Sequence, residues 1–170
     1  MFTNLKKHQN NIYFMGLALQ QAERTLGNTK KNPTVGCVIV KNHHVISAGY
    51  TSINGRPHAE QNAINFSKTN PKNSKLYVTL EPCSHFGKTP PCVNSIIKNK
   101  IKKVIFSIKD PDPRSFNKCS KKFRNKDILV MNGILKDKIK FFYRSYLKSK
   151  KKKFTFCYKQ IGHIKRLLYY

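Results

Sequence analysis

Apolar residues in this chain gather in short runs that alternate with polar turns and with segments of helical spacing. Short apolar runs predict five strands, the second directly after the first as a hairpin and the last at a sheet edge: 35–40, 45–50, 76–80, 101–108 and 127–130. Apolar spacing of three and four residues, with glycine or proline breaks, predicts four helices: 10–26, 58–67, 92–98 and 136–147. Strands with interleaved helices indicate an α/β fold, a three-layer α/β/α sandwich with a central mixed five-stranded sheet.

The length and composition fit one globular domain followed by a short tail. The chain has 170 residues, of which 39% are hydrophobic, and we assign 1–147 to the domain and 148–170 to a basic C-terminal tail. No apolar run approaches the roughly 18 residues of a membrane span, and the polar N-terminus lacks a signal-peptide core. Five cysteines, an odd number, favour metal binding over a disulfide framework. We therefore expect a cytoplasmic protein that does not enter membranes.

The formal net charge of +27 changes the list of partners to consider. A charge of this size is typical of nucleic-acid binders. However, lysine far outnumbers arginine and is scattered along the chain, with one dense run at 148–153. Compositional drift in an AT-rich coding sequence gives the same pattern, and nucleic-acid sites favour arginine and stacking aromatics. We interpret most of the charge as drift, with the run as a solvated tail; the field would still steer an anionic substrate toward the protein.

Four side chains in two motifs carry the candidate chemistry. His58 and Glu60 belong to Pro-His-Ala-Glu, and Cys83 and Cys92 flank a loop of eight residues. One imidazole and two thiolates can hold a zinc ion and leave one position open for water, as in catalytic zinc sites. A carboxylate at Glu60 can take a proton from metal-bound water and pass it to a leaving amine. His-x-Glu with a later Pro-Cys and a second Cys is the signature of zinc-dependent base deaminases.

The spacing of the two cysteines narrows the family. The general signature has two residues between the cysteines, whereas this chain has Ser-His-Phe-Gly-Lys-Thr-Pro-Pro. With Asn-Pro-Thr-Val-Gly-Cys-Val-Ile-Val at 32–40, this stretch resembles the deaminase domain of the bifunctional riboflavin biosynthesis deaminase/reductase, over about 13–113. The resemblance implies a cytidine deaminase-like fold, zinc as cofactor, His58, Cys83 and Cys92 as ligands, and Glu60 as the catalytic acid/base.

Further residues match the family's substrate-binding positions or depart from its pattern. A lysine and a hydroxyl between the cysteines suit a phosphate. The resemblance implies contacts with the substrate and its ribose-phosphate arm from Asn32, His85, Lys88, Thr89 and Asp110. Asp112 stands where the family usually has Asn, and 115–123 lacks the family's glycine-rich turn.

The resemblance also implies the reaction and its neighbours. The substrate would be 2,5-diamino-6-ribosylamino-4(3H)-pyrimidinone 5′-phosphate, and the product 5-amino-6-(5-phosphoribosylamino)uracil. In the family a reductase domain begins near Phe154, so 148–170 can be read as a relict of its start. The sequence shows no glycine-rich dinucleotide loop, and we expect a separate reductase polypeptide for the next step. A homo-oligomer is expected because sister domains associate.

Two alternatives remain at this point. A nucleic-acid base deaminase, for instance one acting on tRNA, would suit the positive charge, although the long spacing between the cysteines disfavours it. The other alternative is a non-enzymatic RNA-binding module stapled by a closed zinc site. Such a site needs a fourth protein ligand, for which the sequence offers Cys37, His85 or Cys119.

Overall fold

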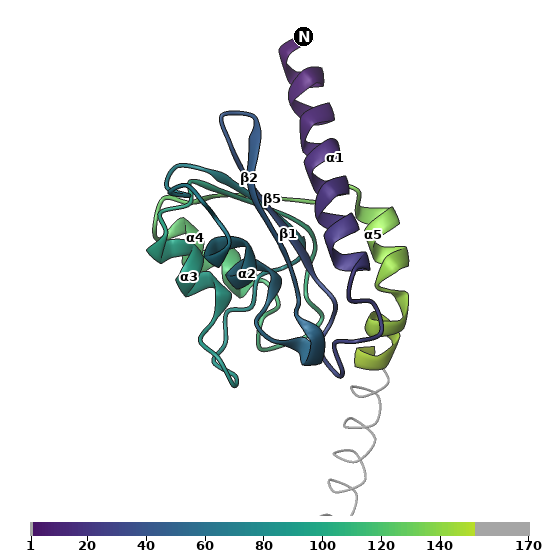
Figure 1. Cartoon of the computed structure of the whole chain (residues 1–170). Coiled ribbons are helices and arrows are strands. Elements are labelled where there is room, and N and C mark those ends of the chain that lie inside the picture. The colour runs from purple at the N-terminus through teal and green to yellow at the C-terminus, as the bar shows by residue number, and fades with distance from the viewer. Residues whose placement is uncertain (1, 152–170) are drawn as a thin grey trace, which may run out of the picture.

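A computed structural model describes residues 2–151 and shows a mixed sheet between two layers of helices (Figure 1). The sheet has the order β2-β1-β3-β4-β5. β1 is antiparallel to both β2 and β3, whereas β3, β4 and β5 run parallel to one another. The strands are β1 (Gly36–Lys41), β2 (His44–Tyr50), β3 (Lys75–Leu80), β4 (Lys103–Ile108) and β5 (Leu129–Asn132). The predicted α/β/α sandwich with a mixed five-stranded sheet is therefore confirmed.

Helices cover both faces of the sheet, and Figure 1 shows α1 and α5 on one side with α2, α3 and α4 on the other. The helices are α1 (Phe2–Glu23), α2 (Ala59–Asn65), α3 (Cys92–Lys98), α4 (Lys118–Arg124) and α5 (Lys136–Phe142), with a 3-10 turn η1 (Ile53–Gly55). Helical turns resume at 144–151 after a break at Tyr143. These turns cross the predicted boundary between domain and tail, and the remainder of the predicted tail lies outside the described residues. Within 2–151, no helix is both long and apolar enough to cross a membrane.

The core lies on both faces of the central strands, where apolar side chains are fully buried. Tyr77, Phe106 and Phe123 are the largest of these. Two glycines allow the helices to approach the sheet closely. A Cβ at Gly36 would lie 1.8 Å from the carbonyl oxygen of Ala18 in α1, and one at Gly49 would lie 2.4 Å from a backbone nitrogen in α2. Gly36 therefore serves helix packing and leaves no room for a ligand at that point.

The element boundaries differ from the predicted ones in places where local pattern is weak. α1 begins eight residues before the predicted 10–26 helix, and β5 is shifted two residues beyond 127–130. α4 was not predicted, because its segment has no glycine before it to mark a turn. Asn117 supplies that turn instead, with a φ of 59°, which Asn tolerates better than most residues. His58 precedes α2 with an extended backbone, so the prediction that it lies in the first turn is wrong.

Candidate active site

Three segments bring the predicted metal ligands together. His58 directly precedes α2, Cys83 follows the end of β3, and Cys92 is the first residue of α3. Their ligand atoms all lie within 4.8 Å of one another. The carboxyl end of a strand next to helix starts is where α/β sheets usually place their sites. Residues up to 34 positions apart in sequence thus converge on one point, as the sequence predicted.

The geometry of this cluster fits a zinc ion. Zinc binds sulfur at about 2.3 Å and nitrogen at about 2.0 Å in a tetrahedron, which places nitrogen and sulfur ligands about 3.6 Å apart. Nδ1 of His58 lies 3.3 Å from Sγ of Cys92 and 3.6 Å from Sγ of Cys83. Across residues 2–151, three candidates for a fourth ligand stay outside the cluster: Cys37, His85 and Cys119. A site with three protein ligands is of the open, catalytic kind.

The two sulfurs differ in their electrostatics. The Cys92 thiol donates a hydrogen bond to Cys83, and the Cys92 backbone N–H lies 3.2 Å from the same sulfur. Together with the adjacent His58, these hydrogen bonds lower the pKa of Cys83 to about 4. The same contact raises the pKa of Cys92 well above its usual range, and burial adds to this. The hydrogen bond to Cys83 also raises the pKa of His58. Cys83 is therefore already disposed to be a thiolate, which is the form that binds metals.

Glu60 lies in the first turn of α2 and is only 4% exposed. Burial, and then the negative charge of Cys83, raise the pKa of Glu60 to about 7. Glu60 lines the same cavity as His58 and Cys83. A carboxyl with a pKa near the working pH suits both acceptance and donation of a proton.

A cavity of about 410 Å³ opens beside the cluster, and most of the predicted substrate-binding residues line it. The cavity is lined by four of them: Asn32, His85, Lys88 and Asp110. Thr89 is not a lining residue; its hydroxyl accepts a hydrogen bond from the Arg56 guanidinium. Four of the five predicted residues thus line one cavity, and the exposed Thr89 contacts Arg56, which lines it too.

Hydrogen bonds hold several of these side chains in place. The amide of Asn32 donates to the Gly55 carbonyl at 3.1 Å, and Nδ1 of His85 lies 2.9 Å from the Ser115 hydroxyl. Asp110 accepts a hydrogen bond from the Tyr146 hydroxyl at 3.0 Å. These contacts fix the side chains before any ligand arrives.

Glu81 has a structural role beside the site. Its Oε2 accepts hydrogen bonds from the backbone N–H groups of Asp110 and Asn117, each at 3.3 Å. These bonds fasten the loop after β4 to the end of β3. The cavity wall therefore depends on a buried carboxylate that need not touch the substrate.

The cavity is also lined by cations that the sequence analysis did not single out: Lys31, Arg56, Arg114 and Lys150. Arg56 lies two residues before His58, and this proximity to the motif is the one signal that could have identified it. Lys31 directly precedes the stretch 32–40 and Arg114 lies two residues after Asp112, whereas Lys150 comes from a segment without a motif. In a chain with 34 lysines and arginines, residue type alone could not find them.

Comparisons with known proteins agree with the geometry. Residues 8–108 match the family model described as the cytidine and deoxycytidylate deaminase zinc-binding region. The structure superimposes on that of Acinetobacter baumannii RibD with a TM-score of 0.81 and 38% identity, covering 85% of this chain and 41% of that one.

Curated relatives place the chain more narrowly. It is 39% identical over 136 residues to the diaminohydroxyphosphoribosylamino-pyrimidine deaminase of Buchnera aphidicola subsp. Schizaphis graminum, a match that covers 80% of this chain and 92% of the relative. It is 44% identical over 124 residues to the riboflavin biosynthesis protein RibD of Aquifex aeolicus, covering 73% of this chain but only 35% of the relative. The chain thus belongs to the zinc-binding cytidine and deoxycytidylate deaminase family, among the RibD-type diaminohydroxyphosphoribosylaminopyrimidine deaminases.

Proposed function

We propose that this chain catalyses the hydrolytic deamination of 2,5-diamino-6-ribosylamino-4(3H)-pyrimidinone 5′-phosphate to 5-amino-6-(5-phosphoribosylamino)uracil, a step of riboflavin biosynthesis. The observation that carries the proposal is the convergence of His58, Cys83 and Cys92 beside a buried Glu60 in one cavity. The kinship with a Buchnera deaminase over nearly its whole length supports the choice of substrate.

The residues divide the chemistry between them. His58, Cys83 and Cys92 would hold zinc, which supplies the Lewis acidity that makes water a nucleophile near neutral pH. Glu60 takes a proton from the attacking water as the new carbon–oxygen bond forms at the amine-bearing ring carbon. Glu60 then gives that proton to the amine, the carbon–nitrogen bond breaks, and ammonia departs. Burial of Glu60 keeps bulk water from competing for this proton.

The phosphorylated arm is assigned to the loop between the two cysteines. Lys88 is exposed, lines the cavity and offers a point charge for a phosphate. His85 and Asn32 line the same cavity and can bind hydroxyl or ring polar groups. Thr89 would act from its place beside Arg56. Asp110, buried and hydrogen-bonded to Tyr146, would bind a donor group of the substrate.

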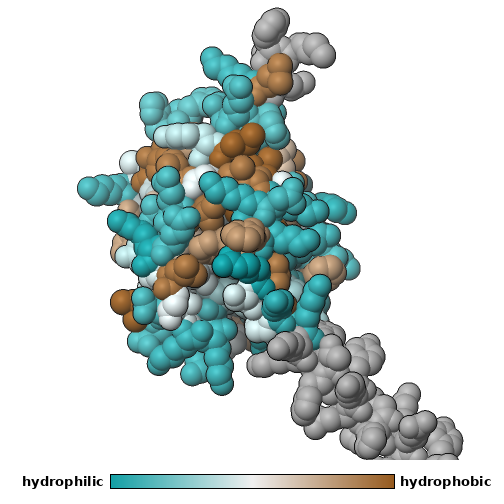
Figure 2. Space-filling model, turned by 90° about the vertical axis from the view of Figure 1, so that its right-hand side faces the viewer, coloured by the Kyte–Doolittle hydropathy of each residue, from teal (hydrophilic) through white to brown (hydrophobic). Residues whose placement is uncertain are grey.

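The two alternatives are less well supported. A closed zinc staple needs a fourth ligand, and within 2–151 the cluster has three members. An RNA deaminase would need a concentrated basic and aromatic surface. On the face formed by α1 and α5, Figure 2 shows hydrophilic residues spread widely with hydrophobic ones between them. The lysines are also scattered along the sequence, which agrees better with a small anionic substrate.

Two expectations about partners stay predictions. A separate polypeptide would carry out the reduction that follows, and pure chain that reduced the product with NADPH would contradict this. Self-association is expected from kinship alone, and sedimentation of the purified chain would measure it.

Ammonia release is the direct test of the proposed function. The zinc-loaded chain is incubated with the pyrimidinone phosphate, with cytidine and with RNA in parallel. We expect ammonia from the pyrimidinone phosphate and none above background from the two controls. Release from RNA that falls steeply with salt would favour the RNA deaminase instead.

A further inference from the structure

The helical turns at 144–151 form part of the catalytic cavity wall. The Tyr146 hydroxyl donates to Asp110 at 3.0 Å, and Nζ of Lys150 lies 3.3 Å from Oδ2 of Asp112. The Lys150 ammonium also lies 5.5 Å from the centre of the Tyr146 ring, within the range of a cation–π contact. Lys150 belongs to the run that its composition alone would assign to a solvated tail, yet it lines the cavity.

Asp112 holds two cations at this wall. Nε and Nη2 of Arg114 donate to its two oxygens at 2.9 and 2.6 Å, and Lys150 approaches one of them at 3.3 Å. The hydrogen bonds with Arg114 keep the pKa of Asp112 well below its usual range, so the carboxylate is ionised. One negative charge between two positive ones leaves a surplus positive charge at the wall.

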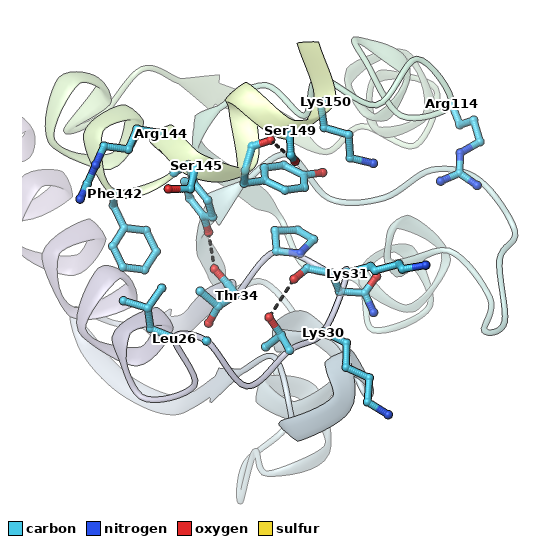
Figure 3. A pocket seen from close by; sticks show the side chains of 16 residues that line it. Leu26, Lys30, Lys31, Thr34, Arg114, Phe142, Arg144, Ser145, Ser149 and Lys150 are labelled. Carbon is cyan, nitrogen blue, oxygen red and sulfur yellow. Dashed lines mark hydrogen bonds between the residues drawn. The ribbon is translucent and has the colours of Figure 1, made fainter. Parts of the chain in front are cut away.

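The two cations that Asp112 holds line two neighbouring cavities. Arg114 and Lys150 line both the cavity beside the zinc ligands and a neighbouring cavity of about 730 Å³. In Figure 3 the Lys150 ammonium extends toward Arg114, and the apolar Leu26 and Phe142 lie at the other end of this second cavity. Lys31 belongs to both cavities as well. The cations therefore gather where the two spaces meet.

We propose that Lys150 and Arg114, positioned by Asp112, form a second cationic wall of the active site that binds the phosphate of the substrate together with Lys88. The inference rests on the proposed function and deepens it, because it assigns specificity for a phosphorylated ligand to a segment outside the sequence motifs. An ammonium has three donors and a guanidinium five, so the contacts with Asp112 leave donors for a phosphate. The Lys150 side chain is 28% exposed and that of Arg114 62%, so both are accessible to a ligand.

Lys148 provides a matched control. It lies two residues before Lys150 in the same helical turns, but it is exposed and lines a different hollow, beside Phe141. A general loss of positive charge should affect the Lys148 and Lys150 variants equally. Only Lys150 should matter if the wall binds a phosphate.

The experiment measures binding of ribose 5-phosphate by calorimetry to the zinc-loaded chain and to four variants: Lys150→Met, Lys150→Arg, Arg114→Met and Lys148→Met. We expect Lys150→Met and Arg114→Met each to weaken binding about five- to tenfold, the scale of a lost charged hydrogen bond at a partly exposed site. Lys150→Arg should keep most of the affinity, and Lys148→Met should match the wild type.

Wild-type affinity in both Lys150→Met and Arg114→Met, or an equal loss in Lys148→Met, would overturn the inference. Thermal melting shows whether Lys150→Met is folded; if it is not, Arg114→Met decides, because its side chain is mostly exposed. The probe needs no turnover, which separates two failures. If binding depends on Lys150 but no ammonia is released, only the proposed reaction is contradicted. If ammonia release is normal but binding does not depend on Lys150, only the proposed phosphate-binding wall is contradicted.

Discussion

At the scale of single residues, Lys88 has a different character from the buried groups around the metal ligands. It is exposed, lies in the loop between Cys83 and Cys92, and lines the cavity. The buried groups, such as Glu60, are fixed by their surroundings, whereas a lysine on a loop can follow its ligand. Its contribution should therefore appear in affinity for the charged group more than in the chemical step.

Lys88→Ala tests this assignment. The variant should lose about tenfold or more in kcat/KM with the phosphorylated substrate, because one charged hydrogen bond is removed. The dephosphorylated form should be affected little. Steady-state ammonia release on both forms measures the difference, with Lys98→Ala in the last turn of α3 as the control. Equal losses on both substrates would remove the phosphate assignment.

The residues of the reaction centre could be named from sequence because their chemistry restricts their type. Few side chains bind zinc, and the spacing of His58, Glu60, Cys83 and Cys92 is specific. The cations at the cavity could not be named, because the positions of Arg114 and Lys150 depend on how a distant turn and the C-terminal helical turns meet. An ion pair of this kind leaves no periodic trace in the sequence.

At the scale of elements, the contact between α1 and β1 is unusually close. Gly36 faces the backbone of Ala18 and Ala22, so the helix rests on the strand without an intervening side chain. β1 pairs with β3, and Cys83 follows the end of β3, so the contact between α1 and β1 also supports the position of Cys83. A change there should act on stability through the spacing of a whole helix.

Gly36→Ala should destabilise the fold by about 2 kcal/mol or more, because the new methyl group would overlap backbone atoms that cannot move separately. Gly16→Ala is the matched control within α1, since a Cβ there meets nothing within 4 Å. That control should gain about 0.5–1 kcal/mol from helix propensity. Urea unfolding of both variants measures the pair. A Gly36→Ala protein as stable as the wild type would contradict the close contact.

Strands were easier to predict than helix ends. β1, β3 and β4 are continuous apolar runs buried on both faces, and their positions were found to within two residues. β5 has no buried residue, so its alternation is weak and its position was shifted. The first turns of α1 are too polar to show a helical face. The predicted 136–147 helix is interrupted at Tyr143, whose buried hydroxyl bonds Thr34 and Thr79.

At the scale of the whole molecule, positive charge is spread widely while negative charge is concentrated. The chain has seven carboxylate side chains, and four of them line the catalytic cavity: Glu60, Glu81, Asp110 and Asp112. Four of the seven acids thus lie where the proposed site needs them. The resulting field attracts anions from every direction while the cavity itself stays chemically mixed.

The field predicts a dependence of rate on salt. Raising the ionic strength from about 0.02 to 0.2 M should lower kcat/KM for the phosphorylated substrate several-fold, because screening weakens steering. The dephosphorylated substrate should show little change. Initial rates of ammonia release across a salt series measure this. The same slope for both substrates would mean that the charge has no role in substrate capture.

Zinc content and turnover of Glu60→Ala, measured on the same preparation, show directly whether Glu60 is the acid/base of a zinc-dependent reaction. We expect the variant to keep a full complement of zinc, because His58, Cys83 and Cys92 are untouched. We also expect kcat on the pyrimidinone phosphate to fall about 100- to 10,000-fold, the contribution of a general acid/base. Turnover within tenfold of the wild type in the zinc-loaded variant would contradict the role of Glu60 as acid/base.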